Sequence, residues 1–419
     1  MGAFSSGAGD VNGDGFGDLL VLAGSFTGDQ LREGRLHLYL GQAGGPAKRA
    51  SWILEGNQDY ANFGLAQAAG DVNGDGYDDV VVGHPSYSNG QLEEGRAALY
   101  LGSPAGLSLT PAWNVESNQA GAALGSSTAA AGDVNGDGFD DVVVGVRYYS
   151  GGEPREGRAL VYLGTPAGLA PTPVWSAEGN QRSSMFCEGV SAGDVNGDGF
   201  DDLLVGAPNF GHGEVEEGAA FLYLGSPLGP SVAPSWVAEG NQERAWFGWT
   251  LSSADVNGDG FDDVIVGAPA YKSSPGLQRG EGRATLYLGS AAGLSASPAW
   301  AMNGSAQGDY FGCVAGQGDV DGDGFDDVLI GANSFDNVER DEGRACLYYG
   351  SARGLSSRPG WCFESNQDHA SLGFPLARTG DLNGDGLAEI LVTAPRFDHG
   401  QIDEGSAFLF LGAARRRNP

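Results

Sequence analysis

Seven short acidic loops recur along the chain, and their residues are of the types that hold a metal ion. Counted along each loop, the first residue is Asp, the third is Asn or Asp, the fifth is Asp, the sixth is Gly and the ninth is an acid. Oxygen ligands at alternate positions, a glycine that permits a sharp turn, and a backbone carbonyl from the seventh residue suit a hard cation such as Ca²⁺. A hairpin turn needs only one Asp-Gly or Asn-Gly pair and gains nothing from three converging carboxylates. The loops therefore predict calcium sites, up to seven in number.

The predicted ligands are given in chain order, with the seventh residue of each loop contributing its carbonyl. They are Asp10, Asn12, Asp14, Phe16, Asp18; Asp71, Asn73, Asp75, Tyr77, Asp79; Asp133, Asn135, Asp137, Phe139, Asp141; Asp194, Asn196, Asp198, Phe200, Asp202; Asp255, Asn257, Asp259, Phe261, Asp263; Asp319, Asp321, Asp323, Phe325, Asp327; and Asp381, Asn383, Asp385, Leu387, Glu389. Only the last loop ends in Glu, so the seventh site is expected to depart most from the common geometry. The eighth residue is acidic in five loops, and we interpret it as an outward-facing charge.

The loops are spaced by 61 to 64 residues, and each repeat carries the same order of short apolar runs. In the third repeat these are DVVVG (141–145), GRALVYLG (157–164) and VWSAEGNQ (174–181), preceded by a run that leads into the loop. Four short strands per repeat and no helical period predict an all-β, seven-bladed β-propeller with the calcium loop between strands 1 and 2 of each blade. This is not an EF-hand, because the twelfth loop residue is Val144 within a strand and not a glutamate.

We expect a single domain over residues 1–419. The repeats run approximately over 1–61, 62–123, 124–184, 185–245, 246–309, 310–371 and 372–412, with a tail over 413–419. The chain ends after the third strand of the last repeat, and Trp opens the fourth strand in only six repeats. We therefore expect a three-stranded seventh blade, a ring closed by packing of blades 1 and 7, and an exposed edge at 406–411. Arginines of the tail would blunt that edge or neutralise nearby carboxylates.

The repeats resemble FG-GAP repeats, the building block of the seven-bladed propeller of integrin α subunits and of many bacterial surface proteins. The resemblance rests on FG at Phe63-Gly64, Phe247-Gly248 and Phe311-Gly312, and on GAP at 206–208 and 267–269. It implies calcium loops on the bottom face and partner binding on the opposite, upper face, through the 2–3 and 4–1 loops. Composition, rich in Ala, Gly and Arg over Lys, is typical of a high-GC bacterium.

Two sets of residues recur on the upper face. Aromatics follow the acid that ends each loop by eight positions, at Phe26, Tyr87, Tyr149, Phe210, Tyr271, Phe335 and Phe397. Such a ring suits an Arg or Lys side chain of a partner, while packing of each aromatic on its own loop explains the repetition equally. The second set is a Glu before strand 3, at Glu33, Glu94, Glu156, Glu217, Glu281, Glu342 and Glu404. It is either bonded to the backbone of a neighbouring blade or part of a ring of ligand-binding carboxylates.

The net charge of −32 argues against nucleic-acid binding, and no run approaches the roughly 20 apolar residues of a membrane helix. No HExxH motif occurs, and the GxSxG match at 189–193 leads into an acidic loop and not into a helix, so we expect no enzyme. The favoured function is a calcium-stabilised adhesion or protein-binding module; a glycan-binding propeller and a structural scaffold are the alternatives. We expect a monomer that acts outside the cell or at its surface, although the sequence shows no signal peptide.

The four cysteines do not indicate a disulfide-rich scaffold. If strands 3 and 4 of the sixth repeat pair as expected, Cys346 stands opposite Cys362, either bridged or as two packed thiols. Cys187 and Cys313 lie in first strands two blades apart and are expected to be free.

Overall fold

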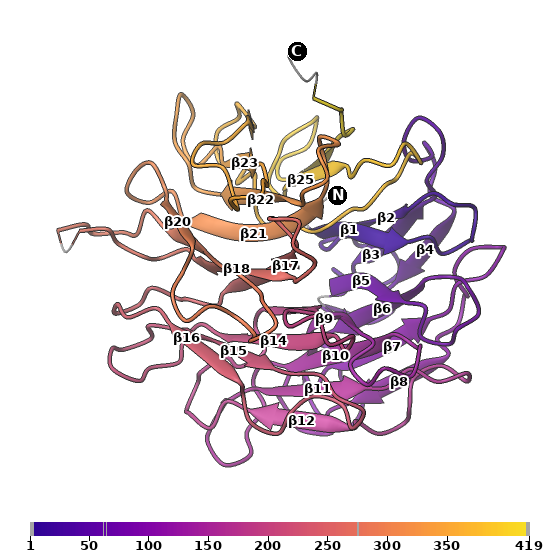
Figure 1. Cartoon of the computed structure of the whole chain (residues 1–419). Coiled ribbons are helices and arrows are strands. Elements are labelled where there is room, and N and C mark those ends of the chain that lie inside the picture. Colours follow the sequence, from indigo (N-terminus) through magenta and orange to yellow (C-terminus); the bar gives the residue numbers. More distant parts are fainter. Residues whose placement is uncertain (1–3, 62, 64, 275, 416–419) are drawn as a thin grey trace.

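The structure, a computed structural model, describes residues 4–61, 63, 65–274 and 276–415. Its first six repeats each form one four-stranded antiparallel sheet in which consecutive strands pair. The sheets are arranged around a centre, with the first strand of each sheet innermost and the fourth at the periphery (Figure 1). The all-β propeller architecture is therefore confirmed.

The second, third and fourth strands have nearly the same length in every repeat, whereas the first strands range from four to nine residues. The first strands are β1 (Phe4–Gly9), β5 (Leu65–Gly70), β9 (Leu124–Gly132), β13 (Val190–Gly193), β17 (Thr250–Ala254) and β21 (Phe311–Gly318). The second strands are β2 (Asp18–Ala23), β6 (Asp79–His84), β10 (Asp141–Val146), β14 (Asp202–Ala207), β18 (Asp263–Ala268), β22 (Asp327–Ala332) and β25 (Ile390–Ala394). The third strands are β3 (Arg35–Tyr39), β7 (Arg96–Tyr100), β11 (Arg158–Tyr162), β15 (Ala219–Tyr223), β19 (Arg283–Tyr287), β23 (Arg344–Tyr348) and β26 (Ser406–Phe410). The fourth strands are β4 (Trp52–Glu55), β8 (Trp113–Glu116), β12 (Trp175–Glu178), β16 (Trp236–Glu239), β20 (Trp300–Asn303) and β24 (Trp361–Glu364).

The hydrophobic core lies between neighbouring sheets, which is why the second strands are apolar on both faces. Strands β6, β10, β14, β18 and β22 are buried at every position. The fourth-strand tryptophans bind each sheet to the next. Trp113, for example, packs edge-on against Tyr162 with ring centroids 4.8 Å apart and donates its Nε1–H to the Ala170 carbonyl at 3.1 Å.

The seventh repeat differs from the expectation of three strands. Only β25 and β26 pair there, as a two-stranded sheet, so a ring of seven blades with a three-stranded seventh is wrong for the described residues. The segment expected as its first strand makes a single bridge, Leu376 to Val392. Pro375 in this segment has no amide hydrogen to donate, which prevents a regular ladder. The segment contacts both neighbours: the Gly7 amide of β1 donates to the Arg378 carbonyl at 2.9 Å, and the Gly373 amide donates to the Thr393 carbonyl of β25 at 3.0 Å.

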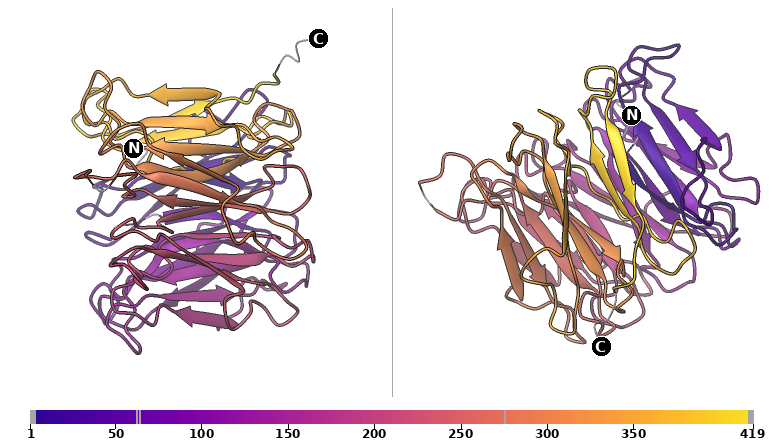
Figure 2. Two further views of the ribbon diagram at one scale, coloured as in Figure 1. Left: turned by 60° about the vertical axis from the view of Figure 1, so that its left-hand side comes forward. Right: turned by 90° about the horizontal axis from the view of Figure 1, so that it is seen from above.

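The two ends of the chain nevertheless pack together, as the closure prediction required. Leu19 and Val21 of β2 form one buried cluster with Leu382 and Leu391. Figure 2 shows β25 and β26 lying beside the first sheet. The edge strand β26 is covered on one face, because Phe410 packs against Trp361 with ring centroids 4.8 Å apart.

The register of the sixth sheet places Cys346 opposite Cys362, as predicted, and the two are joined by a disulfide. Cys187 and Cys313 are free and buried. The predicted positions Gly64, Arg416 and Arg417 lie outside the described residues.

Candidate metal centre

Each acidic loop is organised around its first aspartate. In the second repeat, Asp71 Oδ1 accepts the amides of Gly74 (2.7 Å) and Asp75 (3.1 Å), and Oδ2 accepts that of Gly76 (2.8 Å). The Asn73 side chain accepts the Asp75 amide at 2.9 Å and donates to the Asp75 carboxylate at 3.0 Å. Gly74 and Gly76 have φ of 71° and 89°, which glycine adopts without strain. The sequence pattern thus bends the chain so that the polar side chains turn into the loop.

The ninth residue of the loop lies beneath the others and is fully buried. Asp79 Oδ1 accepts the Gly102 amide at 2.8 Å, and Oδ2 accepts the Val72 amide at 3.2 Å. Burial raises the pKa of this carboxyl to about 7, despite those hydrogen bonds, and Asp75 and Asp71 raise it further. Burial likewise raises the pKa of the equivalent acids to about 6 or 7; these are Asp18, Asp141, Asp202, Asp263, Asp327 and Glu389.

The seventh and eighth residues connect each loop to the loop before it. The eighth residue is not the outward-facing charge expected from the sequence: Asp78 Oδ2 accepts the Asp10 amide at 2.7 Å, and Asp140 and Asp201 accept the equivalent amides. The seventh residue covers the glycine at position four, so a Cβ on Gly13 would lie 2.6 Å from the Tyr77 ring. These contacts cross from one repeat to the next because neighbouring loops lie side by side.

The chain of loops closes on itself. The amide of each eighth residue donates to the carbonyl of the preceding loop's first residue, and the series ends with Gly17 donating to Asp381 at 2.8 Å. Phe16 covers Gly384 in the same way as the aromatics of the other loops. Neighbouring repeats are therefore coupled through the acidic loops, including the first and the last.

Two loops bring three acidic groups within 4.8 Å of one another in the part of the chain that the structure describes. These are Asp319, Asp321 and Asp327, and Asp381, Asp385 and Glu389. In the sixth loop, the Arg415 Nε atom lies 2.6 Å from Asp321 Oδ2, and its guanidinium lies over the Tyr349 ring at 3.2 Å. Asp321 replaces the asparagine of the other loops, so the tail neutralises the additional acid, as expected of its arginines.

The residues present fit a cation. The ninth acids are buried, and among the described residues only Asp321 of the predicted ligands has a salt-bridge partner. A buried carboxylate without a counter-charge is costly, and a divalent ion would provide that charge. Which carbonyls and carboxylates would coordinate the ion stays a prediction, including the carbonyls of the seventh residues.

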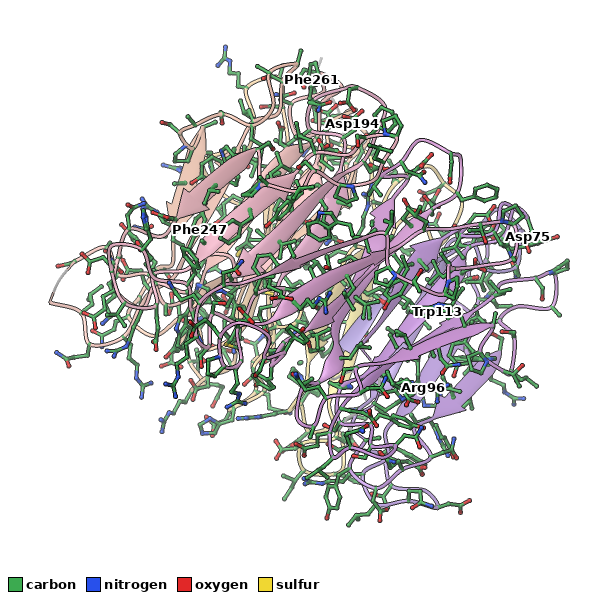
Figure 3. All side chains as sticks on the ribbon, turned by 90° about the horizontal axis from the view of Figure 1, so that it is seen from below. Asp75, Arg96, Trp113, Asp194, Phe247 and Phe261 are labelled. Atoms are coloured by element: carbon green, nitrogen blue, oxygen red, sulfur yellow. A yellow bond between two sulfur atoms is a disulfide. The ribbon has the colours of Figure 1, made fainter. Side chains whose placement is uncertain are left out.

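The aromatics predicted to bind a partner lie at the opposite end of the sheets. Figure 3 shows Asp75 of the acidic loop and Arg96 of β7 at opposite ends of the second sheet. Five of the aromatics are covered by the arginine that begins strand 3 of the same repeat. The distances from guanidinium carbon to ring centroid are 3.6 Å (Arg35–Phe26), 5.4 Å (Arg96–Tyr87), 5.0 Å (Arg158–Tyr149), 4.4 Å (Arg283–Tyr271) and 5.0 Å (Arg344–Phe335).

The two repeats without that arginine compensate with a phenylalanine on strand 3. Phe210 packs on Phe221, and Phe397 packs on Phe408, with centroids 5.5 and 5.3 Å apart. Packing within each repeat therefore explains why the aromatics recur. Their role toward a partner stays a prediction.

The recurring glutamates support the loops between strands 2 and 3. Glu156 Oε1 accepts the Gly151 and Glu153 amides at 2.8 and 3.1 Å, and Glu33, Glu94, Glu217, Glu281 and Glu342 make equivalent bonds. All six are at least 95% buried. The expected partner was the backbone of a neighbouring blade; these bonds are instead to the glutamate's own loop.

Sequence reasoning missed a glutamine that connects neighbouring repeats. Gln181 donates to the Gly211 carbonyl and accepts the Gly211 amide, both at 2.7 Å. Gln58, Gln119, Gln242 and Gln367 do the same. The recurrence of Asn-Gln after strand 4 was the available signal, but its spacing carried no recognised chemistry.

Exposed aliphatic side chains on the 2–3 loops were also missed. Leu31, Leu92, Val215, Val338 and Ile402 are 47 to 85% exposed, and they occupy five of the seven loops at this end of the sheets. Three more exposed aliphatics, Leu109, Leu228 and Val232, lie in connections between strands 3 and 4 at the acidic-loop end. The exposed aliphatics of the 2–3 loops therefore recur, one in each of five loops, at the end of the sheets opposite the acidic loops.

Comparison with known proteins identifies the repeats. The FG-GAP repeat model matches residues 188–223, 247–287 and 377–410, and the FG-GAP-like repeat model matches 10–82 and 71–144. Integrin alpha-5 of Xenopus laevis is 34% identical over 221 residues, which cover 50% of this chain and 20% of the relative. Phosphatidylinositol-glycan-specific phospholipase D of Homo sapiens is 29% identical over 397 residues, covering 84% of this chain and 46% of the relative.

The chain thus spans less than half the length of these relatives. A solved structure of BBS1N in complex with ARL6DN aligns over 98% of this chain and 95% of that chain, with 12% identity and a TM-score of 0.49. Within the described ranges, no helix is long and apolar enough to cross a membrane.

Proposed function

We propose that this chain, which is built of FG-GAP repeats, is a calcium-stabilised protein-binding module that acts outside the cell or at its surface. The similarity to integrin α subunits supports protein binding. The observation that carries the proposal is the recurrence of exposed aliphatic side chains on the 2–3 loops, at the end of the sheets opposite the acidic loops. These five side chains, called the apolar rim below, give a partner several contact points around the same end of the sheets.

Calcium has a structural role in this proposal. The acidic loops connect every repeat to the next and also the last to the first, so a cation in each loop stabilises the whole ring. Half of the 54 acidic residues lie in the loops, and seven Ca²⁺ ions would reduce the net charge from −32 to −18. Calcium affinities of about 10⁻⁴–10⁻³ M are typical of extracellular modules, which supports an extracellular location.

The test of binding compares two faces of the same molecule. One variant carries Leu31→Asp, Leu92→Asp, Val215→Asp and Ile402→Asp. The matched control carries Leu109→Asp, Leu228→Asp and Val232→Asp at the acidic-loop end. Both are immobilised and exposed to surface-biotinylated proteins of the source cells, with calcium or with EDTA. Calcium-dependent capture that is lost only in the first variant supports the proposal; equal capture by both variants contradicts it.

The module is proposed to be non-catalytic, although three relatives are phosphatidylinositol-glycan-specific phospholipases D. The loop acids are engaged in backbone hydrogen bonds, and the upper glutamates are buried against their own loops. Incubation with a phosphatidylinositol-glycan substrate should release no product, with or without calcium. Turnover that survives purification to homogeneity would assign the chain a catalytic role.

A further inference from the structure

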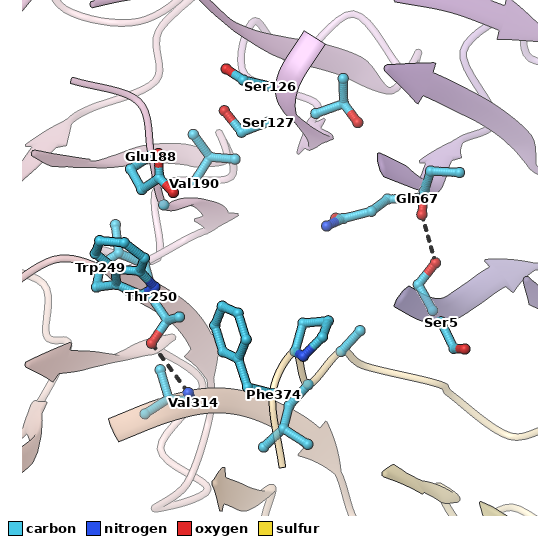
Figure 4. Close-up of a pocket in the computed structure, with 18 of the residues that line it drawn as sticks. Ser5, Gln67, Ser126, Ser127, Glu188, Val190, Trp249, Thr250, Val314 and Phe374 are labelled. Atoms are coloured by element: carbon cyan, nitrogen blue, oxygen red, sulfur yellow. Dashed lines mark hydrogen bonds between the residues drawn. The ribbon is translucent and has the colours of Figure 1, made fainter. Parts of the chain in front are cut away.

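The mouth of the central channel is the place where the repeats stop resembling one another. A cavity of about 360 Å³ opens there, lined mainly by the first strands and the segments that precede them. Figure 4 shows Glu188 and Trp249 on one side of the opening, Gln67 and Ser5 on the other, and Phe374 beside them. The acidic loops, the fourth-strand tryptophans and the upper glutamates are nearly the same in every repeat. The residues at the mouth differ between repeats, so they can form one site that is not repeated around the ring.

Two departures from the repeat pattern meet in this cavity. Arg147 stands where four repeats have the proline of the GAP motif, and Glu188 follows Cys187, which replaces the glycine of FG. Arg147 binds Glu188 through two contacts, Nη2 to Oε1 at 2.6 Å and Nε to Oε2 at 2.5 Å. The Glu188 side chain is only 8% exposed. The pair therefore adds fixed donors and acceptors to the wall without adding net charge.

Aromatic side chains line the cavity next to this ion pair, and Trp249 lies on the same side of the opening as Glu188 (Figure 4). Trp249 and Phe374 line the cavity and continue into a smaller one of about 220 Å³ that contains Trp246 and Tyr310. Trp246 and Tyr310 have φ of 55° and 53°, a conformation that bulky residues rarely adopt. Ala123, Met185 and Ser371 occupy the same position in other repeats, so among the described residues Trp246 and Tyr310 are the aromatic ones at this strained position.

Polar groups complete the cavity. Gln67 projects into the opening (Figure 4), and its side-chain amide has no hydrogen-bond partner among the residues described. The hydroxyl groups of Ser127 and Thr250 line the wall, where they are bonded to the Cys187 and Gly312 carbonyls. The cavity thus has aromatic faces on one side and planar or hydroxylic polar groups around them.

We propose that this cavity binds one saccharide unit, a neutral polyhydroxylated ring. A charged ligand would be buried without a counter-charge, because Arg147 and Glu188 already neutralise each other. A wholly apolar ligand would leave the ion pair and Gln67 without the hydrogen bonds they make to water. A pyranose satisfies both sides: one face of C–H groups stacks on Trp249, and its hydroxyls bond to the ion pair and to Gln67. The site is single and asymmetric, and it is independent of the apolar rim.

The test titrates the full, calcium-loaded chain with methyl glycosides of glucose, galactose, mannose, fucose and N-acetylglucosamine. Binding is followed by calorimetry and by tryptophan fluorescence. Two variants remove the site: Trp249→Ala, and the double variant Arg147→Pro with Glu188→Gln, which leaves no unpaired buried charge. Tyr60→Ala removes an exposed aromatic outside the cavity and is the matched control. Melting temperatures in calcium show that each variant is folded.

One glycoside is expected to bind with a stoichiometry of one, independently of salt. Affinity should fall about tenfold in each site variant and stay unchanged in Tyr60→Ala. The proposal is overturned if no glycoside binds, or if binding persists in both site variants. Binding of several equivalents per chain would place sugars between repeats and not at the channel. Selective binding of methylammonium or arginine amide at this cavity would make it a cation site, which also contradicts the proposal.

Discussion

The pH dependence of stability without calcium tests the metal account most directly, and Asp79 is the residue to change. In the folded, metal-free chain the pKa of Asp79 is raised from 3.8 to about 7, first by burial and also by Asp75 and Asp71. Between these two values the folded chain holds a proton that the unfolded chain has lost. Because the folded state then binds more protons, the free energy of unfolding falls as pH rises through this window.

The magnitude follows from the shift. One pKa unit corresponds to about 1.4 kcal/mol, so about three units give roughly 4 kcal/mol for one loop once the pH exceeds 7. Calcium at a free concentration of about 100 times its dissociation constant raises the free energy of unfolding by roughly 2.7 kcal/mol per site. Seven coupled loops therefore make the metal-free protein much less stable at pH 8 than at pH 5. Calcium should remove most of that difference.

The assay is thermal unfolding by circular dichroism at pH 5 and pH 8, with EDTA or with calcium. Asp79→Asn removes one titrating group while keeping the side-chain volume, and Glu153→Gln removes an exposed acid outside the loops. In EDTA, Asp79→Asn should lose less stability than the parent chain between pH 5 and pH 8. In calcium it should be the less stable of the two at pH 8, and calorimetry should find one ion fewer. Glu153→Gln should match the parent in every condition.

Two results would refute the reasoning. The first is a melting temperature in EDTA that rises between pH 5 and pH 8, because the sign of the linkage would then be wrong. The second is an Asp79→Asn variant that keeps both the parent's calcium stoichiometry and its response to EDTA, since a buried ligand cannot be lost without effect.

Three further predictions concern contacts outside the ligands. Arg415→Ala should lower the melting temperature of the metal-free chain and raise the calcium affinity of one site, because the guanidinium and the ion compete for Asp321. When Arg415→Ala is made in an Asp321→Asn chain, calorimetry should show neither effect. His84 is buried, and burial together with the nearby Arg96 charge lowers its pKa to about 3, so the free energy of unfolding falls as pH falls from about 6.5 toward 3. His84→Ala, compared with His399→Ala in urea titrations, should weaken that loss. Gln181→Ala breaks two hydrogen bonds between repeats and should cost about 1–3 kcal/mol in urea unfolding, whereas the native Ala306 already occupies the equivalent position in the fifth repeat.

The sequence predicted the repeating part of the fold because its physics is local. An Asp-rich loop with glycines at its turning points and a run such as DVVVG specify the hairpin of strands 1 and 2 without help from distant residues. The opposition of Cys346 and Cys362 followed from counting along one hairpin, and the structure has that register. The prediction that failed was the three-stranded seventh repeat: its first segment contains Pro375, which cannot donate to a ladder, and the segment forms no regular strand with β25.

The same distinction between local and distant contacts explains which site residues were predicted correctly. The loop acids were found because metal ligands follow a spacing rule, but the role of Asp78 was misjudged because its partner, the Asp10 amide, lies 68 residues away. The glutamines that connect neighbouring repeats and the exposed aliphatics were missed for the same reason. Their roles depend on which repeat lies beside them in space, and the periodicity of the sequence does not show those contacts directly.

Departures from the repeat carry the remaining information. A contact needed by every repeat is repeated, as the arginine over Tyr149 shows, and where the arginine is missing a phenylalanine such as Phe221 takes its place. A residue that departs from the repeat pattern and has no such substitute is explained by the residues that it contacts. Asp321 is explained by Arg415, and Arg147 by Glu188, in each case by a second departure that neutralises the first. In a ring of near-identical units, such paired departures distinguish one repeat from the next, so a single ligand is most reasonably sought where several of them converge.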